Sequence, residues 1–296
     1  MKNKKLWIFF TLIIALGIFV SKSFLGWSGE TSESDNSNKA APKFENFDPK
    51  NFDEKSTNVN NKWMPLVPGT LFVYKGTTVE DDGKIVPHRI EVNVTDLTKE
   101  IGGVRSVITW DLDYSDNKLV EAELAFYAQD KDGNVWRMGE YPEEYSDGEF
   151  DKASPWMHGI KGARAGIMMQ ATPKVGTPSY SQGWGPEVDW TDRGQVDKMD
   201  EKFCVPVACY QNVLVIAETS ASEPDAVQLK YYAPDVGNVK VGWRGKGEKS
   251  KEILELDKQE MRSQDSLESV REEALKLENH AYEVSRDVYG LTKKAK

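Results

Sequence analysis

The chain of 296 residues is long enough for one large domain or two small ones, with a hydrophobic core of ordinary size. Hydrophobic residues make up 39% of it and charged residues 29%, as in globular proteins with polar extensions. The formal net charge of −10 argues against a nucleic-acid partner, because phosphate binding requires an excess of Lys and Arg, and it equally disfavours electrostatic binding to an anionic membrane surface.

The first 27 residues have the pattern of an export signal. Lys2, Lys4 and Lys5 precede the apolar run 6–20 (LWIFFTLIIALGIFV). This run is short for a membrane-spanning helix, which needs about 20 residues, although Trp27 and its neighbours would extend it. We expect residues 1–27 to be a cleaved signal peptide or a retained N-terminal anchor, and the only part in contact with a membrane. The protein is then periplasmic, extracellular, or anchored at the outer face of the cytoplasmic membrane.

Residues 28–60 form a polar segment rich in Ser, Asn, Asp, Glu and Lys, without apolar periodicity. Such a segment buries too little surface to offset its ordering entropy, so we expect a tether. Its second half contains a short duplication around Phe47 and Phe52, and these two rings could hold the segment against the domain.

Residues 61–256 read as one antiparallel β domain. Runs of β-branched and aromatic residues with rough alternation are separated by short turn signals, and no helical period intervenes between the early runs. The runs are 70–80, 85–96, 104–114, 118–130, 212–220 and 226–245. We expect a mainly β fold, in which an antiparallel meander forms a curved sheet or an incomplete barrel.

The stretch 130–134 (DKDGN) poses a choice between a calcium loop and a turn. It lies between two strand patterns, where Asp-Gly suits the positive φ of a hairpin. An EF-hand loop would end in Glu, but Tyr141 occupies its twelfth position. We expect a hairpin turn.

Between the two groups of strands, from Tyr141 to Met199, strand patterns fail, and we expect a long lid-like loop there, with a candidate ligand site at 154–190. Its candidate ligand residues are Trp156, His158, Arg164, Trp184 and Trp190. Long loops on a β scaffold often carry binding sites, and aromatic rings with Arg could stack on a sugar or hold an acidic group. The alternative is a purely structural lid whose aromatic side chains are buried.

Cys204 and Cys209 flank a tight turn in the sequence FCVPVACY. In an oxidising compartment two such thiols pair, so we predict a disulfide between them rather than two free cysteines. His88, His158 and His280 share no ligand spacing with one another or with Cys. We therefore predict neither a metal site nor a cofactor.

Residues 257–296 change to a helical period, with apolar residues at alternating steps of three and four. The apolar positions are Leu267, Val270, Ala274, Leu277, Ala281, Val284 and Val288. Asp265 or Ser266 could cap the start of the helix, and Gly290 suits its end. The stripe is wider than a coiled-coil seam, which favours docking on the protein's own sheet over dimerisation, although the oligomeric state stays open.

Four stretches resemble the signature motifs of a widespread family of secreted bacterial proteins. They are NKWMPLVPGTLFVYKG, YAQDKDGNVWRMGE, GIMMQATPKVG and QLKYYAPDVGNVK. The motifs consist of turns, Pro-Gly pairs and packed aromatic residues, so the resemblance implies export and a shared scaffold rather than a particular reaction.

Three functions fit the sequence. The first is an exported binding or carrier module without a catalytic site, for an apolar or aromatic small molecule. The second is a structural or assembly protein that engages an envelope protein through its C-terminal helix. The third is a hydrolase using carboxylates such as Glu140, Glu143 and Glu144, which we consider the weakest because nothing selects two of them as a pair.

Overall fold

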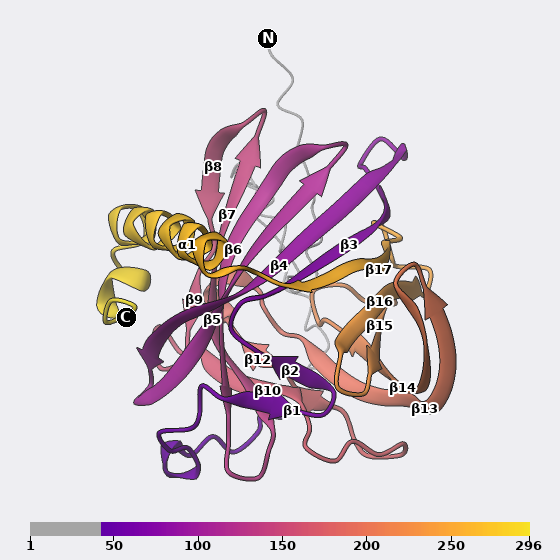
Figure 1. Ribbon diagram of the computed structural model, residues 1–296, viewed down its shortest axis with the longest axis horizontal. Helices are drawn as coiled ribbons and strands as arrows, with labels where there is room; N and C mark the ends of the chain where they lie inside the picture. Colours follow the sequence, from indigo (N-terminus) through magenta and orange to yellow (C-terminus); the bar gives the residue numbers. More distant parts are fainter. Residues whose placement is uncertain (1–42) are drawn as a thin grey trace, which may run out of the picture.

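The computed structural model describes residues 43–296, so the predicted export signal lies outside the described residues (Figure 1). The fold is mainly β, as predicted: the described chain contains a two-stranded sheet, a 15-stranded antiparallel sheet and one α-helix. The small sheet pairs β1 (Val59–Asn61) with β2 (Met64–Leu66). The large sheet contains β3 (Thr70–Val79), β4 (Ile85–Ile101), β5 (Val104–Ser115), β6 (Lys118–Gln129), β7 (Val135–Ser146), β8 (Glu149–Ala153), β9 (Trp156–Met157), β10 (Arg164–Met169), β11 (Tyr180–Ser181), β12 (Gly183–Trp184), β13 (Arg193–Val205), β14 (Ala208–Thr219), β15 (Val227–Ala233), β16 (Gly237–Arg244) and β17 (Ile253–Met261).

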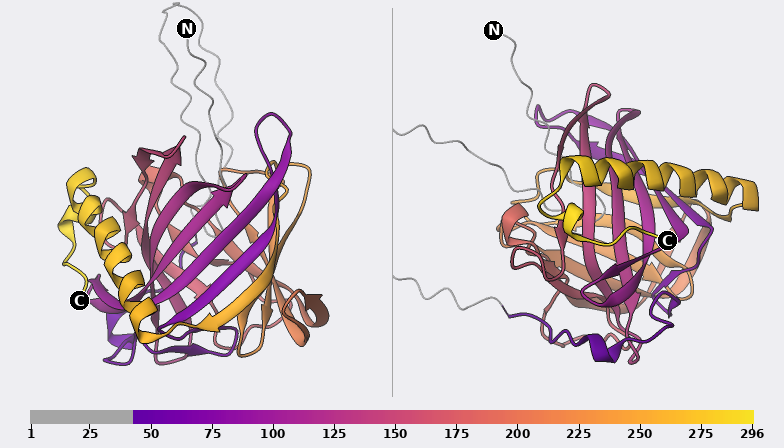
Figure 2. Two further views of the ribbon diagram at one scale, coloured as in Figure 1. Left: turned by 45° about the horizontal axis from the view of Figure 1, so that its top comes forward. Right: turned by 90° about the vertical axis from the view of Figure 1, so that its left-hand side faces the viewer.

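The large sheet consists of two meanders joined edge to edge. Strands β3 to β7 pair in sequence, strands β13 to β17 do the same, and β17 pairs with β3. The first and last strands of the spatial order, β11 and β12, are separated along the chain by Gln182 alone. The sheet is therefore strongly curved, and its strands are steeply tilted in Figure 2, which fits the predicted curved sheet or incomplete barrel.

Short turns with special backbone angles join the strands of the first meander. The turn at 130–134 is confirmed as the β6–β7 hairpin: Gly133 has φ +92°, and Asp130 accepts hydrogen bonds from the backbone of Asp132 and Asn134 at 3.0 and 2.8 Å. The Asp130 carboxylate also accepts from the indole nitrogen of Trp136 at 2.8 Å. The hydrogen bonds of this carboxylate therefore stabilise the turn.

Residues 154–190, where we expected one long loop, instead contribute four short strands, β9 to β12. β9 and β10 pair with β7, and β10 also pairs with β12. Three of the four strands have only two residues, and glycines interrupt the segment, so no alternation was visible in the sequence. The segment extends the sheet rather than hanging over it.

The two faces of the large sheet support separate hydrophobic cores. The concave core includes Phe72, Tyr74, Tyr127 and Tyr232, and β1 and β2 add Val59 and Leu66 to it. The convex core includes Leu124, Phe126 and Tyr141, together with residues of the C-terminal helix. Since β1 contacts β6 and β2 contacts β16, the β1–β2 hairpin spans the concave side.

Helix α1 (Gln264–Val284) lies across the convex face of the sheet, as Figure 2 shows. It buries Val270, Ala274, Leu277 and Ala281 there. The predicted boundaries were too wide, because residues up to Met261 continue β17 along β3. The predicted caps, Asp265 or Ser266, were also wrong.

The residue that caps the start of α1 is Ser263. Its hydroxyl accepts a hydrogen bond from the backbone of Ser266 at 3.3 Å. The helix ends at Val284, well before Gly290, although Val288 still packs in the convex core. Across residues 43–296, no helix is both long enough and apolar enough to cross a membrane.

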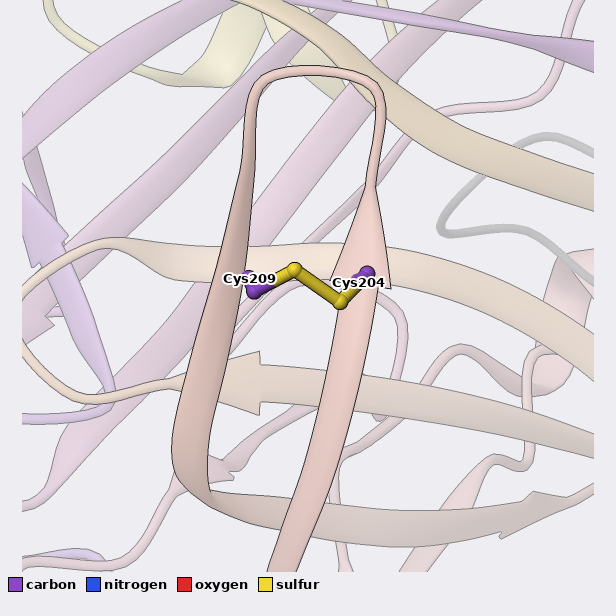
Figure 3. Close-up of a disulfide and its surroundings, with 2 residues drawn as sticks. All are labelled: Cys204 and Cys209. Atoms are coloured by element: carbon purple, nitrogen blue, oxygen red, sulfur yellow. A yellow bond between two sulfur atoms is a disulfide. The ribbon is translucent and has the colours of Figure 1, made fainter.

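Two further predicted features are present. Cys204 and Cys209 form a disulfide that joins directly paired residues of β13 and β14 (Figure 3). Phe47 and Phe52, from the segment predicted to be a tether, pack against Trp136 with ring centroids 5.5 and 6.1 Å away. The described end of that segment, including the 3₁₀ turn Pro49–Asn51, is therefore attached to the domain. Two other 3₁₀ turns span Pro186–Val188 and Tyr289–Leu291.

Candidate functional site

The concave side of the sheet carries a group of buried ionisable residues. Ten of them are at most 7% exposed, and we call them the interior charge cluster: His88, Asp111, Asp113, Glu121, Glu123, Arg137, Glu140, Glu218, Lys230 and Glu252. Strand alternation places most of them. Leu112 and Ala122 belong to the convex core, so their neighbours in β5 and β6 face the concave side.

An irregularity in β7 brings two more members of the cluster to this side. Phe126 of β6 pairs with Gly139 of β7, and the next residue, Tyr127, pairs with Arg137. Met138 between them has no partner in β6, so β7 contains one extra residue, a β-bulge. The alternation therefore shifts by one position, and both Arg137 and Glu140 face the interior. Gly139 is required there, because a Cβ atom would lie 2.5 Å from the carbonyl oxygen of Trp156.

Arg137 is the central cation of the cluster and is completely buried. Its Nη2 atom forms ion pairs with both Glu123 and Glu140, and its Nη1 atom donates to the hydroxyl of Tyr127 at 3.1 Å. Burial raises the pKa of both carboxyl groups, and the guanidinium opposes that shift. One guanidinium thus forms ion pairs with two carboxylates.

His88 is held between two carboxylates in the same way. Its Nε2 atom lies 2.6 Å from Asp113 Oδ1, and its Nδ1 atom lies 3.0 Å from Glu252 Oε1. Burial by itself would lower the pKa of His88, but Asp113 and Glu252 outweigh it and raise that pKa to about 10. Both carboxylates thus favour the protonated form of the imidazole.

Lys230 supplies the third cation. Its Nζ atom lies 3.0 Å from Glu218 Oε2, and Gln182 donates to the other oxygen of Glu218 at 2.6 Å. The cluster as defined then has seven carboxyl groups and three cationic groups. Burial raises the pKa of Asp111 and Glu121 well above the usual range, and neighbouring Glu123 raises both further. The interior has more acidic groups than cations to balance them.

A cavity of about 70 Å³ lies against one side of the cluster. Its wall is mostly apolar and aromatic, with four polar residues, and the β1–β2 hairpin and the start of β16 complete it. The residues that line it are Met64, Pro65, Leu66, Phe72, Tyr74, Val92, Thr109, Asp111, Tyr127, Met168, Lys230, Tyr232, Gly237 and Asn238. A site of this type, apolar with a few polar groups, is typical of small-molecule binding.

Several polar atoms of this wall are buried without a hydrogen bond of good geometry within the described chain, although Thr109 and Asp111 interact with each other. They are both carboxylate oxygens of Asp111, the hydroxyl of Thr109, and the side-chain oxygen and nitrogen of Asn238. Buried polar groups in native proteins are nearly always paired. Other buried polar atoms of the described interior also have no such hydrogen bond, but those of Asp111 and Asn238 adjoin a cavity that could hold a partner. Asp111 matters most, because burial raises its pKa and so opposes ionisation unless a cation lies beside the carboxyl group.

The five residues predicted as a ligand loop do not converge on this cavity. Trp156 and Trp190 are buried against each other, with ring centroids 5.3 Å apart. Arg164 and Trp184 pair across β10 and β12 and contact Phe44 from the outside.

His158, the fifth residue of the predicted ligand loop, lies elsewhere again. Its ring packs on Phe47, with centroids 4.1 Å apart, and its Nδ1 atom accepts from the backbone of Ala165 at 2.9 Å. The structure thus divides the predicted loop residues into a buried pair, an outer pair and a separate histidine.

Of the three carboxylates considered for a hydrolase, Glu140 and Glu144 face the interior, near Glu121, and only Glu143 faces the convex side. Glu140 is in the interior with Arg137, whereas Glu143 faces the convex side and accepts from Tyr141 and Tyr145 at 2.5 and 2.6 Å. Within residues 43–296, no three His, Cys, Asp or Glu side chains are grouped so that they could hold a metal ion.

Sequence reasoning missed the interior charge cluster. The signal was the alternation in ITWDLDY and VEAELAF, which places Asp111 and Asp113 opposite Glu123 and Glu121. Alternating charges are ordinarily read as a solvent-exposed face. Here the sheet curves around the charged face, and the apolar face is covered by α1.

The sequence matches no protein-family model, and no curated protein matches it. Two crystal structures are similar to it. One, from Bacteroides fragilis, is provisionally described as an exported protein with a YmcC-like fold. Its sequence is 12% identical and its TM-score is 0.35, and the match covers 68% of this chain and 99% of the Bacteroides chain. The other, from Parabacteroides distasonis, is provisionally described as a lipoprotein; it has 13% identity and a TM-score of 0.32, with coverage of 68% and 100%.

Proposed function

We propose that the protein is an exported binding or carrier module that holds a small molecule in the cavity on the concave side of its sheet. The observation that carries this proposal is the buried carboxyl group of Asp111, which has no cationic partner within residues 43–296, in the wall of a mostly apolar cavity. A ligand that pairs with Asp111 would remove the cost of burying it, while the apolar wall would contribute hydrophobic contacts.

The other two functions have less support. The apolar stripe of α1 already packs on the convex face of the protein's own sheet, so an assembly partner would have to bind the polar side of the helix. A hydrolase would require carboxylates that converge on a substrate site; Glu143 lies on the opposite face from Glu140 and Glu144, and none of the three lines the cavity. The cavity favours binding.

Native mass spectrometry of protein purified from its own host, without an unfolding step, tests the proposal. We expect wild-type protein to carry an additional small-molecule mass that disappears under collisional activation. The Asp111→Asn variant keeps the side-chain shape but loses the charge, and it should lose that mass. Glu121→Gln is the matched control, because Glu121 is equally buried in the cluster but does not line the cavity.

Two results would refute the proposal. One is a wild-type protein that never carries an additional mass. The other is an additional mass that Asp111→Asn retains and that Trp184→Ala or Arg164→Ala removes, which would move the binding site to the outer pair of the predicted ligand loop.

A further inference from the structure

Building on the proposed function, we infer that the ligand is a small organic cation, an alkylammonium or quaternary ammonium compound, held between Asp111 and the aromatic side chains of the cavity. Asp111 is 7% exposed, forms no ion pair within the described chain, and has only the hydroxyl of Thr109 beside it as a polar contact. It lines the cavity directly. A positively charged group placed there would meet an unused buried carboxylate.

The charge balance around the cavity selects a cation over an anion. Glu123, which pairs with Asp111 across β5 and β6, already shares Arg137 with Glu140. Lys230 also lines the cavity, but it is paired with Glu218 at 3.0 Å. An anionic ligand would add to the seven carboxyl groups of the cluster, whereas a cation would offset one of them.

The aromatic wall supplies a second attraction for a cation. Phe72, Tyr74, Tyr127 and Tyr232 all line the cavity. The faces of aromatic rings attract ammonium groups, most strongly where water is excluded. The hydroxyl of Tyr74 donates to the backbone oxygen of Asn238 at 3.0 Å, so its hydrogen-bonding capacity as a donor is already used. Its ring, rather than its hydroxyl, is left for a ligand.

The dimensions limit the ligand to a small molecule. A cavity of about 70 Å³ holds about five water-sized groups. A compound of about five to seven non-hydrogen atoms, such as a short alkylamine or a small quaternary ammonium alcohol, matches that space. Met64 and Pro65 are partly exposed and form the wall on the β1–β2 side, so a ligand would enter past this hairpin.

Isothermal titration calorimetry with two probe pairs tests the inference on the wild-type protein. Choline is compared with its uncharged isostere 3,3-dimethyl-1-butanol, and n-butylammonium is compared with n-butanol. Protein is first freed of any retained ligand by extensive dialysis. We expect at least one cation to bind at least about tenfold more tightly than its neutral partner. Asp111→Asn should abolish this preference, and Glu121→Gln should retain it.

Each other outcome overturns the inference. Equal affinity for a cation and its neutral isostere would mean that the cavity selects shape alone, and a preference that survives in Asp111→Asn would place the cation elsewhere. If neither cation binds while native mass spectra still show a retained molecule, the ligand is of another class and the proposed binding function stands. If no probe binds and no molecule is retained, both fail. The comparison within each probe pair uses wild-type protein, so it holds even if a variant does not fold.

Discussion

Removing the buried amine of Lys99 should weaken the attachment of the C-terminal helix to the sheet. Lys99 lies in β4, is 1% exposed, and its Nζ atom donates to Glu278 Oε1 of α1 at 2.8 Å. The same atom donates to the hydroxyl of Tyr282 at 2.9 Å and to the backbone oxygen of Lys293 at 2.5 Å. One side chain from the sheet thus holds the helix and the chain that follows it.

The expected magnitude follows from what Lys99→Met leaves behind. Glu278 is 3% exposed and would keep hydrogen bonds only from the backbone of Ala295 at 2.9 Å and the hydroxyl of Tyr289 at 3.3 Å. Breaking a buried ion pair from one side costs about 3–5 kcal/mol. At about 2–4 °C per kcal/mol for a domain of this size, the melting temperature should fall by about 6–20 °C.

A double-mutant cycle by urea denaturation measures this interaction. Lys99→Met with Glu278→Gln removes both charges and should recover more than half of the lost free energy of unfolding. Lys276→Met is the control, because its ion pair with Glu273 is solvent-exposed and its loss should change stability by less than about 0.5 kcal/mol. If Lys99→Met costs less than about 1 kcal/mol, or if the double variant is no more stable than the single one, the ion pair does not hold the helix.

Three further predictions concern the rest of the domain. Replacing both Cys204 and Cys209 by Ser should cost about 2 kcal/mol in the free energy of unfolding, because the closed loop is short; no loss in denaturation curves would contradict this. Burial opposes protonation of His88, but its two carboxylate partners raise its pKa from 6.5 to about 10. The contribution of this ion-paired histidine to the free energy of unfolding is therefore fully present below pH 6.5 and is lost as the pH rises toward 10. Urea denaturation between pH 6.5 and 10 should show this decline in wild-type protein and a flatter profile in His88→Gln, and identical profiles would refute it. Trp156→Ala should cost about 3–5 kcal/mol and Arg164→Ala less than about 0.5 kcal/mol, because only the tryptophan is buried; equal melting temperatures would show that Trp156 has no structural role.

Local sequence patterns predicted much of the fold, because each feature depends on residues close together in the chain. Strands β3 to β6 and β14 to β16, the turn at 130–134 and the disulfide between Cys204 and Cys209 are of this kind, whereas β13 and β17 were not predicted. The helix was also predicted, but its start was placed too early. Residues 253–261 form strand β17, which pairs with β3. Pairing partners distant in sequence decided that boundary.

The candidate site could not be predicted, because it depends on curvature and on a one-residue irregularity. Asp111 and Glu123 alternate with apolar residues, and the sequence does not say which face of the strand the sheet encloses. Arg137 and Glu140 have a spacing of three, which in a regular strand would put them on opposite faces. Only the extra residue in β7 brings them together.

A crystal structure of the protein purified from its own host, without unfolding and without added ligand, tests the central claim most directly. We predict electron density for a small molecule in the cavity, in contact with the carboxylate of Asp111 and with the rings of Tyr127 or Tyr232. A cavity that contains only ordered water, with the oxygens of Asp111 bonded to it, would contradict the proposed function.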